Sequence, residues 1–228
     1  MQISIQDLST GYGDNTIIRS LFIDLPCHAF IAVVGHNGAG KSTFLNALSN
    51  QIAYKGRVIF PDNHHKIAKL GQKNQINFSI PVKDLVVMGL FTQKKIFQSY
   101  AGEQLIQAME VLAQNQISHL ANKDFLTLSG GEQQLVWLSQ MMLQHKDIYI
   151  FDEPTQYLDI AHTQLIFNKL QQMVSQHQKT VICVTHHIHY LKDMDGYILN
   201  LSLPKPTLQK ISRLVIEETV ANLSQIGL

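Results

Sequence analysis

The chain of 228 residues is 45% hydrophobic and 15% charged, which is typical of a large domain built around a sizeable core. Its formal net charge is only +1 and no block of like charges occurs, so we expect no nucleic-acid partner. The two cysteines, Cys27 and Cys183, favour a reduced compartment without a disulfide framework. The N-terminus has no signal-peptide pattern, and no apolar run approaches the roughly 18 residues that span a bilayer, so we expect any membrane-spanning part to be another chain.

The first third of the chain predicts strands followed by a helix. Ile3 and Ile5 alternate with polar residues, and residues 17–25 are mostly apolar. Residues 31–34 form a short, wholly apolar run, as expected for a buried strand. The run leads into GHNGAGKS and then a helical pattern at 43–50, and short strand candidates follow at 57–60 and 67–70. A strand, a glycine-rich turn and a helix are therefore expected to follow one another directly.

The middle of the chain, from about 75 to 129, changes in character and predicts helices. Pro81 opens a helical segment that contains Leu85, Val86 and Leu90. At 103–114 the apolar residues fall on one stripe, which is typical of an amphipathic helix. We expect this region to form a helical sub-lobe.

The last part returns to alternating helices and strands. Helices are predicted at about 132–143 and around 165–174, and buried strands at 148–151 and 181–185. This alternation indicates a mostly parallel sheet with helices on its faces. Two prolines, at 204 and 206, mark a break before a final helical tail.

The glycine-rich turn fits the phosphate-binding P-loop, because Gly35 is followed after four residues by Gly40-Lys41-Ser42. In such a loop the backbone N–H groups point at phosphate oxygens, and the helix N-terminus that follows favours negative charge. Lys41 is expected to neutralise the β- and γ-phosphates, and the Ser42 hydroxyl to bind Mg²⁺. The alternative is an ordinary glycine-rich turn, which the flanking strand and helix make less favourable.

Two acids, Asp152 and Glu153, follow the buried strand at 148–151, where open α/β sheets bind ligands. Asp152 is expected to hold Mg²⁺, and Glu153 to orient and deprotonate the attacking water as general base. The alternative is a pair of solvated acids at a strand end. His186 follows the next strand and is a candidate for the γ-phosphate, or else an ordinary strand-end histidine. Gln72 is a candidate for reaching Mg²⁺ or the water.

The sequence LSGGE places Ser129, Gly130 and Gly131 at the start of a predicted helix. Backbone N–H groups, a hydroxyl and a helix terminus make this a second candidate anion site. Since this site cannot serve the same nucleotide within the same subunit, we expect it to serve a nucleotide bound by a second copy. The alternative is a helix cap with a flexible turn.

Together these motifs resemble the ABC ATPase family, over about residues 2–203. The resemblance implies that Tyr12 stacks on adenine, unless it is a plain edge-strand aromatic, and that Asp159 couples two sites across a dimer. It also implies ATP contacts from Gly35, Asn37, Gly38, Ala39, Gly40, Lys41, Ser42 and Thr43, catalytic roles for Glu153, His186 and Gln72, Mg²⁺ contacts from Ser42, Gln72 and Asp152, and contacts in trans from Ser129, Gly130, Gly131 and Glu132.

The fold implied by the resemblance is an α/β P-loop NTPase. It has a mostly parallel core sheet, an N-terminal antiparallel β subdomain and a helical sub-lobe that carries the signature LSGGE. We expect one ABC ATPase domain over 1–228. Its core and β subdomain are expected at 1–74 and 145–203, the helical sub-lobe at 75–144 and a C-terminal tail at 204–228.

The partners implied by the resemblance are a second copy of the chain and two integral-membrane permease subunits that dock near 77–91 on the cytoplasmic face of a cell membrane. A solute-binding protein is expected to take part indirectly. FSIPVKDLVVMGL, ISHLANKDFLTLSGGE and DEPTQYLDIAH are similar to ATPase subunits that import iron chelates, haem or cobalamin. Zinc or manganese importers, exporters and non-transport ABC ATPases are the alternatives.

The chain departs from the family pattern at several positions. His28-Ala29 stand where the family often has Gly-Glu, Leu135 lies in a turn where Arg is usual, and His187 stands where Asp is usual. The groups expected to carry the chemistry are all present. We therefore expect these departures to affect rate or dimer contacts more than activity itself.

Overall fold

The computed structural model describes residues 1–61, 67–72, 74, 76–93 and 102–226. At its centre lies a six-stranded sheet with the strand order β5-β6-β7-β3-β8-β9, which is parallel apart from the antiparallel pair β8 and β9. The strands are β3 (Phe30–Val34), β5 (Ile67–Leu70), β6 (Ile148–Asp152), β7 (Thr180–Val184), β8 (Tyr197–Asn200) and β9 (Leu208–Lys210).

The three central strands β3, β6 and β7 consist entirely of buried residues, and successive side chains point to opposite faces of the sheet. On one face, Ile31, Ile150 and Ile182 join an apolar cluster with α1 (Lys41–Leu48). On the other face, Phe151 and Cys183 join the cluster formed with the other helices. Because both faces are covered, these strands read as continuous apolar runs rather than alternating ones.

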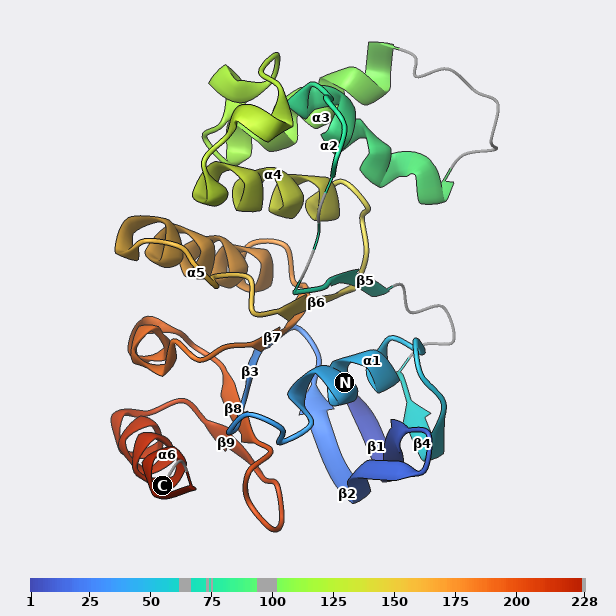
Figure 1. The fold of residues 1–228 in the computed structure, drawn as a ribbon, viewed down its shortest axis with the longest axis vertical. Coiled ribbons are helices and arrows are strands. Elements are labelled where there is room, and N and C mark those ends of the chain that lie inside the picture. Colours follow the sequence, from blue (N-terminus) through green and yellow to red (C-terminus); the bar gives the residue numbers. More distant parts are fainter. Residues whose placement is uncertain (62–66, 73, 75, 94–101, 227–228) are drawn as a thin grey trace.

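A second, antiparallel sheet has the order β2-β1-β4 and consists of β1 (Gln2–Tyr12), β2 (Asn15–Pro26) and β4 (Tyr54–Ile59). Its buried residues Ile3 and Leu25 share an apolar cluster with Phe44 of α1. Helix α1 is therefore packed against both sheets, as Figure 1 shows. This packing fixes the glycine-rich loop that precedes the helix.

Most of the helical segments lie between β5 and β6 in the chain and gather at one end of the molecule, at the top of Figure 1. They are α2 (Val82–Val87), η1 (Met88–Gln93), α3 (Gly102–Gln114), η2 (Ser118–Leu120), η3 (Phe125–Thr127) and α4 (Gly130–Met142). After β6 follow α5 (Ile160–Ser175), η4 (Ile188–Asp193) and α6 (Arg213–Ile226). None of the helices among the described residues combines the length and the apolar character needed to cross a membrane.

The predicted fold class is confirmed, with a mostly parallel core sheet, an N-terminal antiparallel sheet and a helical segment that carries the signature. Two helix starts were placed two residues late, because α1 begins at Lys41 and α4 at Gly130. Helix α1 begins directly after a glycine and α4 begins at one, and because glycine is a poor helix former the sequence pattern hides both starts. Strands β8 and β9 were missed. The division of the chain into lobes at 75, 145 and 204 stays a prediction.

Candidate functional site

The glycine-rich loop between β3 and α1 bends where glycine is the relaxed residue. Gly38 and Gly40 have φ angles of 85° and 89°, in the left-handed region. The Nζ atom of Lys41 donates to the carbonyl oxygens of Gly35 and His36, at 2.8 and 3.0 Å. The loop therefore curls around the ammonium group, the arrangement expected of a P-loop.

The turn after β8 supports the same loop from its other side. The N–H of His36 donates to the Ser202 hydroxyl at 2.8 Å, and the N–H of Ser202 donates to Oδ1 of Asn200 at 2.9 Å. Asn200 is 2% exposed, so the contact is anchored in the core. Sequence analysis missed Ser202 because it missed the strand that precedes it. The signal that was available is the short apolar run at 197–201.

Asp152 is the last residue of β6, and it is a buried acid beside the P-loop with an exposed fraction of 7%. Its carboxylate accepts a hydrogen bond from the Ser42 side chain, but Oδ1 has no hydrogen-bond partner within the described part of the chain. Burial raises the pKa of this carboxyl, while Ser42, Lys69 and Lys41 act in the opposite direction. A carboxylate oxygen without a protein donor, next to a serine hydroxyl, is a set of oxygen ligands that fits Mg²⁺.

Lys41 is the buried cation that faces these acids, and it is likewise 7% exposed. Burial lowers the pKa of its ammonium group, and the carboxylates of Glu153 and Asp152 act in the opposite direction. The site thus holds a desolvated positive charge at the loop where phosphate is expected to bind.

Glu153 lies at a sharp turn after β6, where its φ angle of 55° is uncommon for a residue other than glycine. The Nε2 of Gln72 donates to its Oε2 at 3.1 Å, and the Nε2 of His186 lies 2.8 Å from its Oε1. The Glu153 side chain is only 14% exposed. Gln72 and His186 follow β5 and β7, so three neighbouring strands bring their ends to one carboxylate. Gln156, which sequence analysis missed, also accepts from Gln72 at 3.2 Å.

Tyr12, the residue expected to stack on adenine, ends β1 and is half exposed. Its hydroxyl accepts from Nδ2 of Asn46 at 2.7 Å, and Oδ1 of Asn46 accepts from Nζ of Lys69. The Lys69 Nζ also donates to Oε1 of Gln51 at 2.8 Å. Sequence analysis missed Asn46 and Lys69, because these contacts join β1, α1 and β5 across long stretches of chain.

The signature tip, which we define as Ser129, Gly130 and Gly131, forms the start of α4. The backbone N–H and the hydroxyl of Ser129 both donate to Oε2 of Glu132 at 2.8 Å, and the N–H of Glu132 points back to the Ser129 hydroxyl at 3.4 Å. This capping box fixes the first turn, whose N–H groups have no acceptor within the helix. The signature tip is therefore an ordered helix end with donors available to an anion.

The structure brings together Lys41, Asp152, Glu153, Gln72 and His186, but not the signature tip. No hydrogen bond or ion pair connects the tip to these residues in the described ranges. Figure 1 shows α4 and α1 on opposite sides of β5 and β6. Within one subunit, the signature tip is thus separate from the P-loop site.

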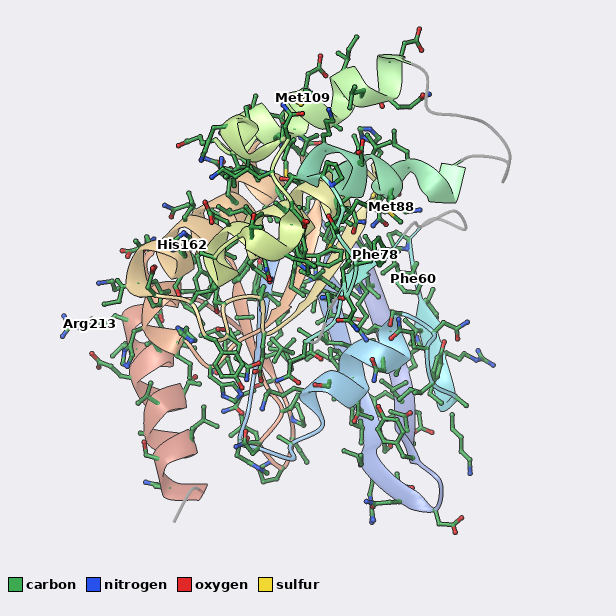
Figure 2. The ribbon with its side chains drawn as sticks, turned by 45° about the horizontal axis from the view of Figure 1, so that its top comes forward. Phe60, Phe78, Met88, Met109, His162 and Arg213 are labelled. Carbon is green, nitrogen blue, oxygen red and sulfur yellow. The ribbon has the colours of Figure 1, made fainter. Side chains whose placement is uncertain are left out.

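The segment predicted to meet a permease, 77–91, contains α2 and the start of η1. Phe78, labelled in Figure 2, is 57% exposed, whereas Val82 and Leu85 of α2 are buried. A Pro81–Asp124 bridge ties the segment to the chain before the signature. The side chain of residue 91 lies outside the described residues.

Known proteins share these features. The sequence pattern of the ABC transporter family matches residues 18–156. The achromobactin transport ATP-binding protein CbrD of Dickeya dadantii (strain 3937) is 32% identical over 198 residues, covering 82% of this chain and 74% of that protein. The ferric enterobactin transport ATP-binding protein FepC of Escherichia coli (strain K12) is 28% identical over 219 residues, covering 88% and 81%.

Among solved structures, a transporter assigned to the metal-chelate type, in an inward-facing conformation, superposes with a TM-score of 0.87. Its sequence is 26% identical, and the match covers 98% of this chain and 89% of that one. The family pattern extends over more than half of the chain and includes the P-loop, the signature and the two acids after β6. The chain belongs to the ABC transporter family, as one of its ATPase cassettes.

Proposed function

We propose that this chain hydrolyses ATP to drive the import of a metal chelate of the iron-siderophore class through partner permease subunits. The names of the two relatives, which transport achromobactin and ferric enterobactin, support this choice over haem or cobalamin. The metal-chelate type of the superposed transporter supports it as well.

The observation that carries the proposal is the Glu153 carboxylate, held by Gln72 and His186 beside Asp152 and Lys41. Glu153 acts as the general base that takes a proton from the attacking water. Gln72 and His186 fix the direction of its two oxygens, since each contacts a different one. A general base of this kind contributes about 10²–10⁴ in rate.

The phosphates are held by the loop that curls around Lys41. On nucleotide binding, the Lys41 ammonium exchanges the carbonyl oxygens of Gly35 and His36 for phosphate oxygens. The phosphate oxygens carry a negative charge, which the neutral carbonyls of the loop do not provide to the ammonium. Ser42 and Asp152 are the residues that hold Mg²⁺, whose charge offsets that of the phosphates when it is bound. Tyr12 stacks on the adenine.

The complete site needs a second copy, because the signature tip lies away from the P-loop of its own subunit. We place two subunits head to tail, so that the tip of one contacts the nucleotide of the other, with Asp159 beside the shared boundary. Such an arrangement is isologous and closes as a twofold dimer.

Two permease subunits are expected to dock at 77–91, so the dimer lies on the cytoplasmic face of a membrane. The exposed ring of Phe78 beside the buried face of α2 supports this segment as the docking surface. A solute-binding protein takes part only through the permease.

The test of the proposed chemistry is Glu153→Gln. Glutamine keeps the shape of the Glu153 side chain and can accept a hydrogen bond from Gln72 or His186, but it cannot take a proton from water. We expect phosphate release to fall about a hundredfold or more, while the affinity for a fluorescent ATP analogue changes little. The matched control is Glu110→Gln on the exposed face of α3, which should retain full activity. Near-normal phosphate release by Glu153→Gln would remove Glu153 from the role of base.

A further inference from the structure

The first turn of α5 contacts the start of α4 through His162, a residue that the motif analysis did not single out (Figure 2). The backbone N–H of His162 donates to Oδ1 of Asp159 at 2.8 Å, and its ring Nδ1 lies 2.9 Å from both carboxylate oxygens. Asp159 is the N-cap of α5. His162 therefore holds this carboxylate from two directions.

The other side of the His162 ring lies against Gly131. A Cβ on Gly131 would fall 2.3 Å from Cδ2, 2.4 Å from Cγ and 2.7 Å from Nε2 of the ring, distances that no side-chain carbon tolerates. Gly131 does not have a left-handed backbone, so what disfavours a side chain there is the imidazole, which a Cβ would have to displace. The second glycine of the signature thus has a packing reason in this chain, beyond access to phosphate.

The contacts of His162 join two segments that the proposed function directs at a second copy. Asp159 ends the short segment that connects Glu153 to α5, and Gly131 belongs to the signature tip. A ring that is hydrogen-bonded to Asp159 through Nδ1 and packed against Gly131 has few rotamers open to it, so a shift of Asp159 displaces the ring and, through it, the tip.

We infer that His162 is a positioning residue, which fixes the signature tip relative to Asp159 so that both reach the partner subunit as one unit. The inference rests on the proposed function, because only a head-to-tail dimer gives the tip a nucleotide to contact. The alternative is that His162 only stabilises the first turn of α5. That alternative predicts a change in thermal stability alone, without an effect on dimer assembly.

The test measures ATP-driven dimerisation by sedimentation in a Glu153→Gln background, which binds ATP without consuming it. Adding His162→Ala should weaken the dimerisation constant by about tenfold, roughly the effect of one charge-assisted hydrogen bond. The ATP affinity of the monomer, measured at low protein concentration, should stay unchanged. His162→Asn, whose amide nitrogen can replace Nδ1, should recover part of the loss.

The matched control is His177→Ala, an exposed histidine beyond the far end of α5, which should leave dimerisation unchanged. If Glu153→Gln dimerises with ATP and adding His162→Ala changes nothing, the inference about His162 is overturned while the proposed function stands. If Glu153→Gln itself stays monomeric with ATP, the proposed function fails and the inference falls with it.

A double-mutant cycle tests the contact independently of assembly. Gly131→Ala should lower the melting temperature because its methyl group meets the imidazole ring. In a His162→Ala background the same change should cost much less, because the ring is gone. Additive losses in the double variant would show that the ring and Gly131 are not in contact.

Discussion

At the scale of single residues, the site keeps charges where water is largely excluded. Lys41 and Asp152 are each 7% exposed. Burial lowers the pKa of Lys41 and raises the pKa of Asp152, and both shifts favour the neutral form of the side chain. The motifs predicted these two residues because a P-loop and a pair of acids after a strand have fixed spacings. The contacts of Ser202, Asn46 and His162 escaped prediction, because each joins segments that only the folded chain brings together.

The raised pKa of Asp152 predicts a conflict between stability and function. The folded protein holds a proton on this carboxyl up to a higher pH than the unfolded chain, whose pKa is near 3.8. The free energy of unfolding therefore falls as the pH rises from 3.8 through the folded-state pKa, and the full cost of the buried charge is present above it.

Asp152→Asn removes that cost, so without metal its melting temperature at pH 7 should exceed that of the native chain. The advantage should vanish below pH 3.8, where both folded and unfolded native chains carry the proton. Thermal unfolding in a chelating buffer at the two pH values measures the difference. A lower melting temperature for Asp152→Asn at pH 7 would contradict the assigned burial penalty. Phosphate release should be lost in the same variant.

At the scale of elements, the start of α4 is a turn that stabilises its helix and that is also proposed to bind nucleotide. Ser129 and Glu132 close the capping box, and hydrogen bonds from Ser129 hold the pKa of Glu132 below its ordinary value. A group with a depressed pKa stabilises the fold above its unfolded pKa and loses that contribution as the pH falls through its folded pKa.

Ser129→Ala should lower the free energy of unfolding at pH 7 by about 1 kcal/mol, the usual effect of losing an N-cap. The difference from the native chain should shrink as the pH falls through the pKa of Glu132, because the protonated acid accepts the bond from the Ser129 hydroxyl more weakly, while the backbone N–H bond is present in both chains. Denaturant titrations at pH 7 and pH 3 give both values. Ser175→Ala, at the exposed end of α5, is the control that should change neither. A Ser129→Ala effect that grows in acid would contradict the capping-box account.

The elements themselves were predictable where burial is complete. Strands β3, β6 and β7 are wholly apolar runs, and each was found within one residue of its observed bounds. Strand β9 has three residues and follows two prolines, so no apolar pattern stands out there, whereas the short apolar run at 197–201 was an available signal for β8. Strand β8 pairs with β3, and β9 pairs with β8. These pairings decide the conformation of both strands, and they are not visible along the chain.

At the scale of the whole molecule, the six-stranded sheet separates two apolar clusters, and the proposed nucleotide site between two copies uses helices from both. One cluster contains residues of α1, the helix that follows the P-loop, and the other contains residues of α4, the helix that begins at the signature tip. Cys183 lies in the second cluster at 0% exposure on β7, the strand that leads to His186. Burial raises the pKa of its thiol well above the ordinary value. Its reactivity therefore reports whether the centre of the sheet is intact.

In a Cys27→Ser variant, a thiol reagent should modify Cys183 only when the domain unfolds. For a domain of ordinary stability this makes labelling at least about a thousandfold slower than in denaturant. The labelling rate, followed by mass spectrometry, should depend on unfolding of the domain and not on access of the reagent to the folded surface. Rapid modification under native conditions would show that β7 opens without global unfolding.

The central claim is that ATP lies between the P-loop of one subunit and the signature tip of another. The most direct test is a crystal structure of Glu153→Gln with ATP and Mg²⁺. The account predicts a twofold dimer in which the hydroxyl of Ser129 from the second copy lies at hydrogen-bond distance, about 3 Å, from a terminal phosphate oxygen held by the loop at 35–42. A triphosphate bound in that loop, with the signature tip of every neighbouring copy turned away from it, would contradict the account.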